Sequence, residues 1–120
     1  MSELVTNKKH ECVEEYPGSI TVCDLAGKIL ELNKMSAVSL RAEGGKKLVG
    51  SNLMDCHPEP ALRELKRLMK HEQTNVYTVT KGRIRKIVLQ TPWYKRGRYR
   101  GFVEISLPIS GRIPNIVRKS

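Results

Sequence analysis

Cys56 and His57 form the one place in the sequence where two potential metal ligands or catalytic groups are adjacent. A zinc site would need two further ligands at compatible spacing, and no CxxC or HxxxH pattern occurs. A thiol nucleophile would need its base alongside, whereas successive side chains diverge on helices and strands. We therefore expect no metal site and no enzymatic activity. The structural alternative is that Asp55 or His57 caps a helix beginning at Pro58, with Cys56 in the core.

Positive charge is concentrated toward the C-terminus. The net charge is +10, residues 1–72 are neutral, and residues 73–120 contain a single acid, Glu104. Basic side chains form a candidate patch comprising Arg83, Arg85, Lys86, Lys95, Arg96, Arg98 and Arg100. Cations contact phosphates and interleaved aromatic rings stack on bases, so nucleic acid is a possible partner. The alternatives are solvated charge that protects a sheet edge, or attraction to an acidic protein partner or anionic ligand.

Length and composition restrict the class of protein. A chain of 120 residues allows one domain and a modest core. No apolar run approaches the roughly 20 residues of a membrane span, and the N-terminus lacks the apolar core of a signal peptide. We therefore expect no membrane association. Three cysteines without close pairing favour reduced thiols and a cytoplasmic location.

A β-hairpin is expected near the N-terminus. Residues 19–23 have the β-branched, alternating composition of a strand. Residues 24–27, Asp-Leu-Ala-Gly, are typical of a turn, because Asp hydrogen-bonds nearby backbone and Gly accepts positive φ. Residues 28–32 then form the return strand.

Two helices are expected after this hairpin. Asn33 is a suitable N-cap for a helix over residues 34–41, in which Met35, Val38 and Leu40 form an apolar stripe. A second helix should end near Lys70, and one of its faces carries Leu62, Leu65, Leu68 and Met69. These apolar residues could form the core or line a pocket, because both would share one wall.

Three further strands are expected over residues 74–80, 83–91 and 101–107, with a basic loop at 94–100. Hairpin connections make the sheet antiparallel. The order of elements predicts an α+β fold, a five-stranded antiparallel sheet with helices packed on one face. We divide the chain into an N-terminal arm or short helix (1–16), a domain (17–109) and a basic C-terminal tail (110–120).

Four segments resemble motifs of the PAS domain family, a group of small sensory modules. They are Ile20-x-Val22-x-Asp24-x-x-Gly27-x-Ile29-x-x-x-Asn33, Leu48-Val49-Gly50-x-x-Leu53, Asp55-Cys56-His57-Pro58, and Tyr99-x-Gly101-x-Val103-Glu104-Ile105. The third resembles a variant found in a subset of the family. Their order and spacing cover roughly residues 17–109.

The resemblance implies a signal-sensing or interaction domain that binds a small-molecule ligand or a protein partner and transmits a conformational change. The candidate pocket residues are Leu30, Met35, Val38, Leu53, Cys56, His57, Leu62 and Leu65. The ligand is left open: a haem could use His57 as its axial ligand, whereas the absence of an Asn-Cys pair argues against a flavin photosensor. The family commonly pairs through an N-terminal helix and the outer sheet face, so a homodimer is a further possibility.

Overall fold

The structure is a computed structural model of the chain, and it describes residues 10–120. A helical turn at residues 10–14 precedes the sheet; the rest of the expected N-terminal arm, residues 1–9, lies outside the described residues. The strands are β1 (Ser19–Asp24), β2 (Ile29–Leu32), β3 (Asn75–Lys81), β4 (Ile84–Lys95) and β5 (Arg98–Ile109). The α-helices are α2 (Lys34–Ser39) and α3 (Ala61–Lys70), with short 3₁₀ helices at Arg41–Glu43, Gly45–Leu48 and Leu53–Cys56.

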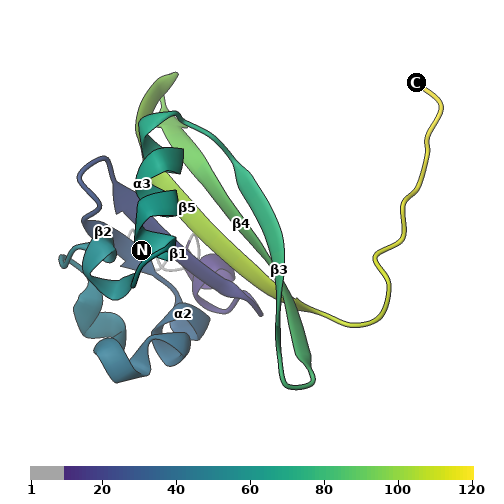
Figure 1. Ribbon diagram of the computed structural model, residues 1–120, viewed down its shortest axis with the longest axis horizontal. Helices are drawn as coiled ribbons and strands as arrows, with labels where there is room; N and C mark the ends of the chain where they lie inside the picture. Colours follow the sequence, from purple (N-terminus) through teal and green to yellow (C-terminus); the bar gives the residue numbers. More distant parts are fainter. Residues whose placement is uncertain (1–9) are drawn as a thin grey trace, which may run out of the picture.

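The five strands form one antiparallel sheet in the order β2-β1-β5-β4-β3. The first and last strands of the chain, β1 and β5, are neighbours, so the sheet joins the two halves of the sequence. Figure 1 shows α2, the 3₁₀ helices and α3 on the same face of this sheet. We call that face the inner face. The α+β fold predicted from the sequence is confirmed.

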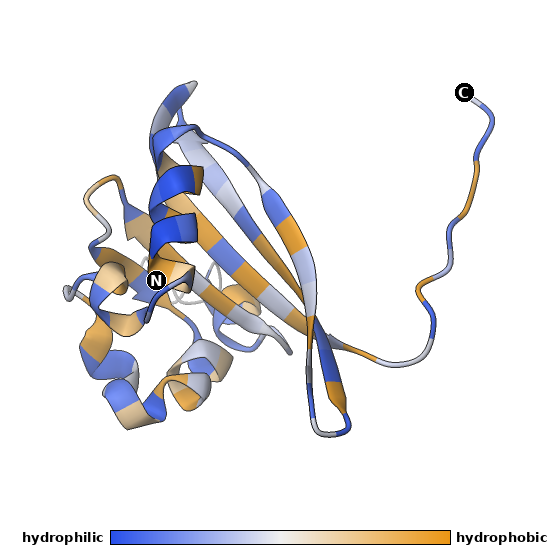
Figure 2. Ribbon diagram, viewed as in Figure 1, coloured by the Kyte–Doolittle hydropathy of each residue, from blue (hydrophilic) through white to orange (hydrophobic). Residues whose placement is uncertain are grey.

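The core lies between α3, the 3₁₀ segments and the inner face of the β2-β1-β5 half of the sheet (Figure 2). Leu65, Leu68 and Met69 supply the buried face of α3, as their spacing predicted. The buried residues they join are Cys23, Ile29, Leu32, Leu48, Leu53 and Phe102. Burying each large apolar side chain contributes about 1.5–3 kcal/mol, which makes this cluster the main source of stability.

Asn33 fixes the junction between the hairpin and α2, and its predicted capping role is confirmed. Its side-chain Oδ1 accepts hydrogen bonds from the backbone N–H groups of Ser36 (3.0 Å) and Ile20 (2.9 Å). Its Nδ2 donates to the carbonyls of Val13 and Gly18, both at 2.9 Å. All of these bonds form at a side chain that is 1% exposed, so one amide connects four segments of the chain.

The apolar stripe predicted next to Asn33 is wrong at Met35 and Val38, whereas Leu40 packs against the core. Met35 and Val38 are 38% and 48% exposed, whereas Ser36 is buried. The Asn33 cap sets this orientation, and the Ser36 hydroxyl shares a 2.5 Å hydrogen bond with Thr21 on the inner face. A helix of six residues packs with less than two turns, so this polar contact decides which side faces the sheet.

The expected basic loop over residues 94–100 is also wrong. β4 continues to Lys95 and β5 begins at Arg98, which leaves a two-residue turn of Arg96 and Gly97. Both turn residues have positive φ, 53° and 78°. Such turns match the twist of the paired strands, so the strands extend to the tip of the hairpin.

The start of α3 differs from the sequence expectation. The helix begins at Ala61, and Pro60 precedes it without a side-chain cap. Neither Asp55 nor His57 caps it. His57 instead follows the 3₁₀ helix Leu53–Cys56, and its ring Nδ1 lies 3.0 Å from the carbonyl oxygen of Leu53. Pro58 and Pro60 have no N–H to donate, but their carbonyls accept the first helical hydrogen bonds, from the N–H groups of Leu62 (3.0 Å) and Glu64 (3.2 Å).

The chain after β5 has neither helix nor strand and extends away from the sheet (Figure 1). One side-chain contact holds its start, a 3.1 Å hydrogen bond from the Arg85 guanidinium to the Gly111 carbonyl. Among residues 10–120, no helix has both the length and the hydropathy of a membrane span.

Candidate functional site

A row of polar side chains crosses the inner face beyond the apolar core. Strand register places Thr21 of β1 opposite Glu104 of β5, Glu104 opposite Gln90 of β4, and Gln90 opposite Asn75 of β3. We call these four residues the polar row. Directly opposite residues in an antiparallel sheet point to the same face, so the row is continuous over four strands.

Hydrogen bonds link three members of the polar row. Asn75 Nδ2 donates to Gln90 Oε1 at 3.1 Å, and Gln90 Nε2 donates to Glu104 Oε2 at 2.8 Å. Gln90 is buried, so its amide is held with both groups occupied. The row therefore presents a fixed arrangement in which the Glu104 carboxylate is the negative end. A carboxylate accepts hydrogen bonds and cannot donate one while ionised.

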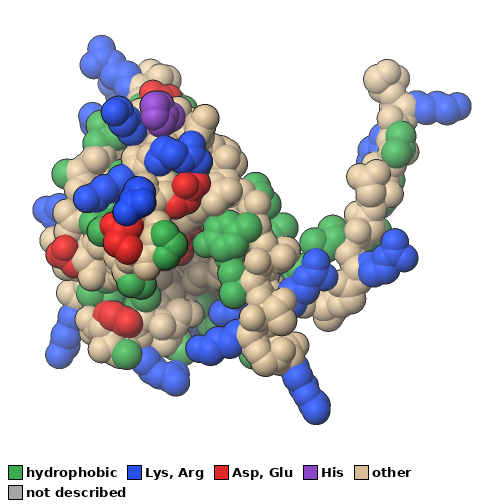
Figure 3. Space-filling view, viewed as in Figure 1, with side chains coloured by type: hydrophobic (Ala, Val, Ile, Leu, Met, Phe, Trp, Pro, Cys, Tyr) green, Lys and Arg blue, Asp and Glu red, His purple; other side chains and the backbone are tan. Residues whose placement is uncertain are grey.

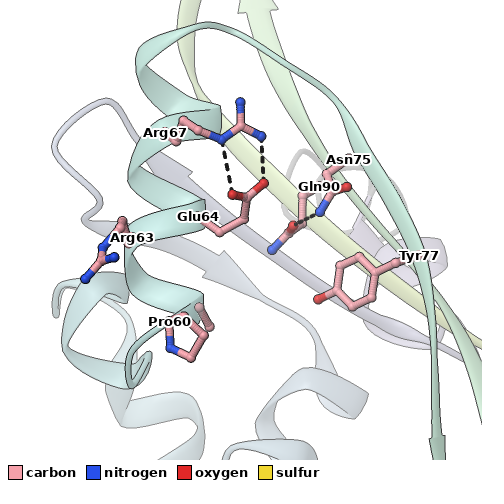
Figure 4. A pocket seen from close by; sticks show the side chains of 8 residues that line it. Pro60, Arg63, Glu64, Arg67, Asn75, Tyr77 and Gln90 are labelled. Atoms are coloured by element: carbon pink, nitrogen blue, oxygen red, sulfur yellow. Dashed lines mark hydrogen bonds and ion pairs between the residues drawn. The ribbon is translucent and has the colours of Figure 1, made fainter.

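α3 and β3 flank a groove of about 620 Å³ above the β3 end of this row (Figure 4). Its lining comprises Pro60, Ala61, Arg63, Glu64, Arg67, Asn75, Tyr77 and Gln90. Figure 4 shows the side chains from α3 on one side and those from β3 and β4 on the other. Small-molecule sites in proteins commonly occupy about 300–1,000 Å³, so the groove has the size of a ligand site.

The helix wall of the groove carries a paired charge. Arg67 Nη2 lies 2.7 Å from Glu64 Oε1, and Arg67 Nε lies 3.1 Å from Glu64 Oε2. This bidentate contact lowers the pKa of Glu64 and raises that of Arg67. Arg67 Nη1 also donates to Gln73 at 2.7 Å. Because each of its three side-chain nitrogens donates to Glu64 or Gln73, Arg67 is a structural cation of this wall, not a vacant anion site.

Tyr77 contributes a hydroxyl from the sheet side. Figure 4 shows its ring directed from β3 into the groove. Burial raises the pKa of Tyr77, and the negative charge of Glu104 raises it further. The neutral phenol is therefore the form present at physiological pH, and it can donate or accept a hydrogen bond. The groove thus combines a phenol, an amide pair and a nearby carboxylate.

The pocket residues predicted from the sequence are distributed over different environments. Leu53 and Leu65 are in the buried core, and Cys56 and Leu62 are half-buried. Leu30, Met35 and Val38 are exposed, so they do not line an interior pocket. None of the eight predicted residues lines the groove between α3 and β3.

The groove residues that sequence reasoning missed had one detectable signal. Glu104, which holds the groove residue Gln90, is the sole acid in residues 73–120, and in an expected strand it shares one face with Phe102 and Ser106. An isolated acid on the same strand face as a core Phe indicates a polar position within the sheet's inner face. Gln90 and Asn75 carried no such signal, because their alignment with Glu104 depends on the register of β3 and β4.

The residues of the chain do not fit a haem at the inner face. Of the histidines, His57 contacts Leu53 beside the 3₁₀ helix, His71 follows α3, and His10 lies 3.4 Å from Glu31. None of the three lines the groove or joins the core cluster. Within residues 10–120, no three His, Cys, Asp or Glu side chains are grouped as metal ligands would be. Burial raises the pKa of the Cys56 thiol, an effect opposite to nucleophile activation.

The structure does not bring the predicted basic patch together. Arg83, Arg85 and Lys86 lie at the β3–β4 turn, whereas the other four members lie at the β4–β5 turn. β4 has 12 residues, which places the two turns about 36 Å apart at the usual strand rise. Figure 3 shows basic side chains at both ends of the molecule, with acidic, hydrophobic and further basic side chains between them.

The aromatic residues between those basic side chains make contacts within the fold. Trp93 Nε1 donates to the Cys23 carbonyl at 2.9 Å, and the Tyr99 hydroxyl donates to the Met69 carbonyl at 2.7 Å. The Tyr94 hydroxyl donates to Glu72 at 2.8 Å. These rings attach the β4–β5 hairpin to β1 and α3 and are not arranged as a base-stacking surface.

Comparison with known proteins identifies the fold. No protein-family model and no curated protein matches the sequence. Among solved structures, a C-terminal domain from Streptococcus mutans superposes with a TM-score of 0.70 at 16% identity, over 86% of this chain and 84% of that one. The PAS domain of an HTR-like protein from Haloarcula marismortui superposes with a TM-score of 0.62 at 17% identity, over 89% of this chain and 99% of that one. The PAS domain of Bordetella pertussis BvgS superposes with a TM-score of 0.60 at 18% identity, over 93% of this chain and 90% of that one.

These similarities, together with the strand order and the helices on one face, show that the chain has the PAS-domain fold. At 16–18% identity they establish the architecture and not the ligand. What the site binds is determined by its own residues.

Proposed function

We propose that this protein is a non-catalytic sensory domain that binds a small polar molecule in the groove between α3 and β3. The observation that carries the proposal is the groove itself, whose volume of about 620 Å³ lies over the hydrogen-bonded Asn75–Gln90–Glu104 chain. The PAS fold supports it, because solved proteins of this fold include sensor histidine kinases.

The chemistry of the groove favours a ligand with an apolar body and at least one hydrogen-bond donor. Pro60 and Ala61 offer apolar surface, while Tyr77 and the amides of the polar row offer directed polar contacts. The Glu104 carboxylate lies next to the groove, bonded to Gln90. Of the two arginines in the lining, Arg67 is paired with Glu64 and Arg63 is largely exposed, so the groove favours a neutral or cationic molecule over an anion. A neutral or cationic molecule of metabolite size satisfies both requirements.

A ligand in the groove could pass its effect to the rest of the domain through α3. The C-terminal end of α3 is bonded to β5 by the Tyr99–Met69 contact, and the following Glu72 is bonded to β4 by Tyr94. A displacement of α3 therefore pulls on the β4–β5 hairpin and on the sheet. The sheet and the chain ends would then present the signal to a partner.

The first experiment is native mass spectrometry and an absorption spectrum of freshly purified protein. A retained small molecule, or thermal stabilisation by members of a metabolite library, is the expected result. A Soret or flavin absorption band would overturn the assignment of a colourless polar ligand. Stabilisation follows mass action and reaches about 2.7 kcal/mol at a ligand concentration 100-fold above Kd.

Variants then locate the binding site. Tyr77→Phe and Glu104→Gln should each weaken binding at least tenfold by calorimetry, because the first removes a hydroxyl that lines the groove and the second removes the carboxylate that holds the Gln90 amide of its lining. Glu31→Gln, an acid on the opposite edge strand β2, is the matched control and should bind normally. Unchanged affinity in both groove variants would show that the ligand binds elsewhere.

A further inference from the structure

The two edge strands of the sheet differ in how far other segments of the chain cover them. On β2, the residues after the 3₁₀ segment cover the backbone: Ile29 N–H donates to the Ser51 carbonyl and Gly50 N–H donates to the Ile29 carbonyl, both at 2.8 Å. β2 is also only four residues long. Short length and a covering segment are common ways to protect a sheet edge from pairing with another chain.

β3, the other edge, has no such protection within the described chain. It pairs with β4 alone, and its seven residues from Asn75 to Lys81 are exposed except for the first. Val76, Tyr77 and Val79 are 54%, 40% and 42% exposed. Residues 75–80, Asn-Val-Tyr-Thr-Val-Thr, contain no proline and no charge. A long, uncharged edge rich in β-formers is a template for a further strand.

We propose that β3 pairs antiparallel with β3 of a second copy of this chain, joining two sheets into one across a two-fold axis at Thr78. The strand is self-complementary in this register. Tyr77 lies opposite the partner's Val79 on the inner face, and Val76 lies opposite the partner's Thr80 on the outer face. Aromatic–β-branched pairs are among the favourable cross-strand pairs.

The charges of the chain are compatible with this arrangement. Lys81 lies opposite the partner's Asn75, so no two like charges are directly paired. The two Lys81 residues lie three positions to either side of the axis, about 20 Å apart at the usual strand rise. That separation exceeds the screening length of about 8 Å at physiological ionic strength, so the basic turns do not prevent association.

The interface involves one strand and a few side chains from each copy. It therefore belongs to the small, transient class of interfaces, below about 1,200 Å² in total. We expect a concentration-dependent dimer, distinct from a permanent one. This association is additional to ligand binding and needs no ligand in order to form.

The test is sedimentation equilibrium of the full chain from about 5 µM to about 1 mM, a range that covers weak association. The wild-type protein should shift from monomer toward dimer. Thr78→Lys and Thr78→Glu each place two like charges on the axis and should each be monomeric. An equimolar mixture of the two variants should recover the dimer, because the opposed charges are then opposite in sign.

Two measurements separate this dimer from other modes of association. Hydrogen exchange should slow in residues 76–80 as concentration rises. Leu30→Lys, which adds charge to an exposed position of the opposite edge strand, should leave the dimer intact. A wild-type monomer at every concentration, or a mixture of Thr78 variants that stays monomeric, would overturn the proposal. So would a dimer whose residues 76–80 exchange as in the monomer, since it would use another surface.

Discussion

At the scale of single residues, Asn33 has the largest structural role of any polar side chain described above. It caps α2 and also holds the chain just before and within the first strand, at Gly18 and Ile20. A buried amide with this many partners cannot be removed without leaving several backbone groups unsatisfied. The hairpin, the helical turn at residues 10–14 and α2 therefore depend on one side chain.

Asn33→Ala should lower the free energy of unfolding by about 2–4 kcal/mol, because it removes a helix cap and strands buried N–H and C=O groups. Urea unfolding followed by circular dichroism measures the change. Asn52→Ala is the control: Asn52 caps a 3₁₀ helix in the same way but is exposed, and its loss should cost about 1 kcal/mol or less. Equal losses in the two variants would contradict the role assigned to Asn33.

The buried thiol of Cys23 makes the free energy of unfolding depend on pH in the alkaline range. Burial raises the pKa of this thiol, with smaller contributions from Asp24 and Glu104 and an opposing one from the Phe102 backbone. Because the folded pKa is above the unfolded one, its stabilising contribution is complete below about pH 8.5 and is lost as pH rises toward the folded value. The loss cannot exceed about 1.4 kcal/mol per pH unit for one thiol.

Urea unfolding between about pH 8 and pH 10 tests this dependence. The free energy of unfolding of the wild-type protein should fall over this interval. Cys23→Ala should be less stable at pH 7, but its free energy of unfolding should fall by less over the same interval. Burial also raises the pKa of Tyr99, but a phenol titrates higher and contributes mainly above this interval. Parallel curves for wild type and Cys23→Ala would exclude Cys23 as the origin.

At the scale of elements, the β4–β5 hairpin is limited by its turn. A two-residue turn with positive φ at both positions favours Asn or Gly, and Arg96 is neither. Placing a residue with a side chain larger than Asn at positive φ costs about 1–2 kcal/mol. The hairpin tolerates this because Trp93, Tyr94 and Tyr99 anchor its strands to β1, α3 and the chain after α3.

Arg96→Asn should therefore raise the free energy of unfolding by about 0.5–1 kcal/mol, while Gly97→Ala should lower it by about 1 kcal/mol. Thermal and urea unfolding both report the change. Arg98→Asn removes the same charge from a strand position and should not stabilise, since Asn is a poor strand residue. Stabilisation by Arg98→Asn as well would attribute the effect to charge instead of turn geometry.

The elements could be predicted from the sequence where the signals are local. The Asp24–Gly27 turn forms as expected, with Asp24 Oδ1 accepting from Ala26 and Lys28 N–H, and α3 buries the face that its spacing indicated. The side of α2 that faces the sheet could not be predicted, because a contact between Ser36 and Thr21, 15 residues apart, decides it. The extent of β4 and β5 was underestimated because Arg96 is an unusual turn residue.

The candidate site was predictable only in part. The sequence indicated an inner face covered by helices, but it located the pocket at residues such as Met35 and Val38, which are exposed. The groove is instead lined by residues from α3, β3 and β4, and the polar row depends on the pairing of strands that are far apart in the chain. Periodicity within one segment carries no information about such register.

At the scale of the whole molecule, the positive charge is divided between two ends of the sheet. The +10 net charge does not create one continuous cationic surface, because the two turns lie at opposite ends of β4. Charges this far apart act independently at physiological ionic strength. This distribution favours long-range attraction of acidic molecules over a defined nucleic-acid path.

A short single-stranded oligonucleotide should consequently contact one end at a time. Each end offers three or four predicted-patch cations, so the slope of log K against log salt should be no steeper than about −3. Fluorescence anisotropy between about 50 and 200 mM salt measures it. Replacing Arg83, Arg85 and Lys86 by Gln should reduce binding. The slope of log K against log salt for the remaining end, the β4–β5 turn, should stay unchanged. A slope of −5 or steeper in the wild type would require both ends to bind together.

Tyr77 belongs both to the groove and to the free edge of the sheet: its ring faces the ligand space, and its backbone lies in the strand proposed to pair. Any ligand that orders this residue would lower the entropic cost of aligning β3 with β3 of a second copy. The two equilibria would then be heterotropically linked, and the linkage must be reciprocal: a ligand that tightens self-association tenfold is itself bound tenfold more tightly by the associated form. Protein concentration would thus set the threshold at which the ligand is detected.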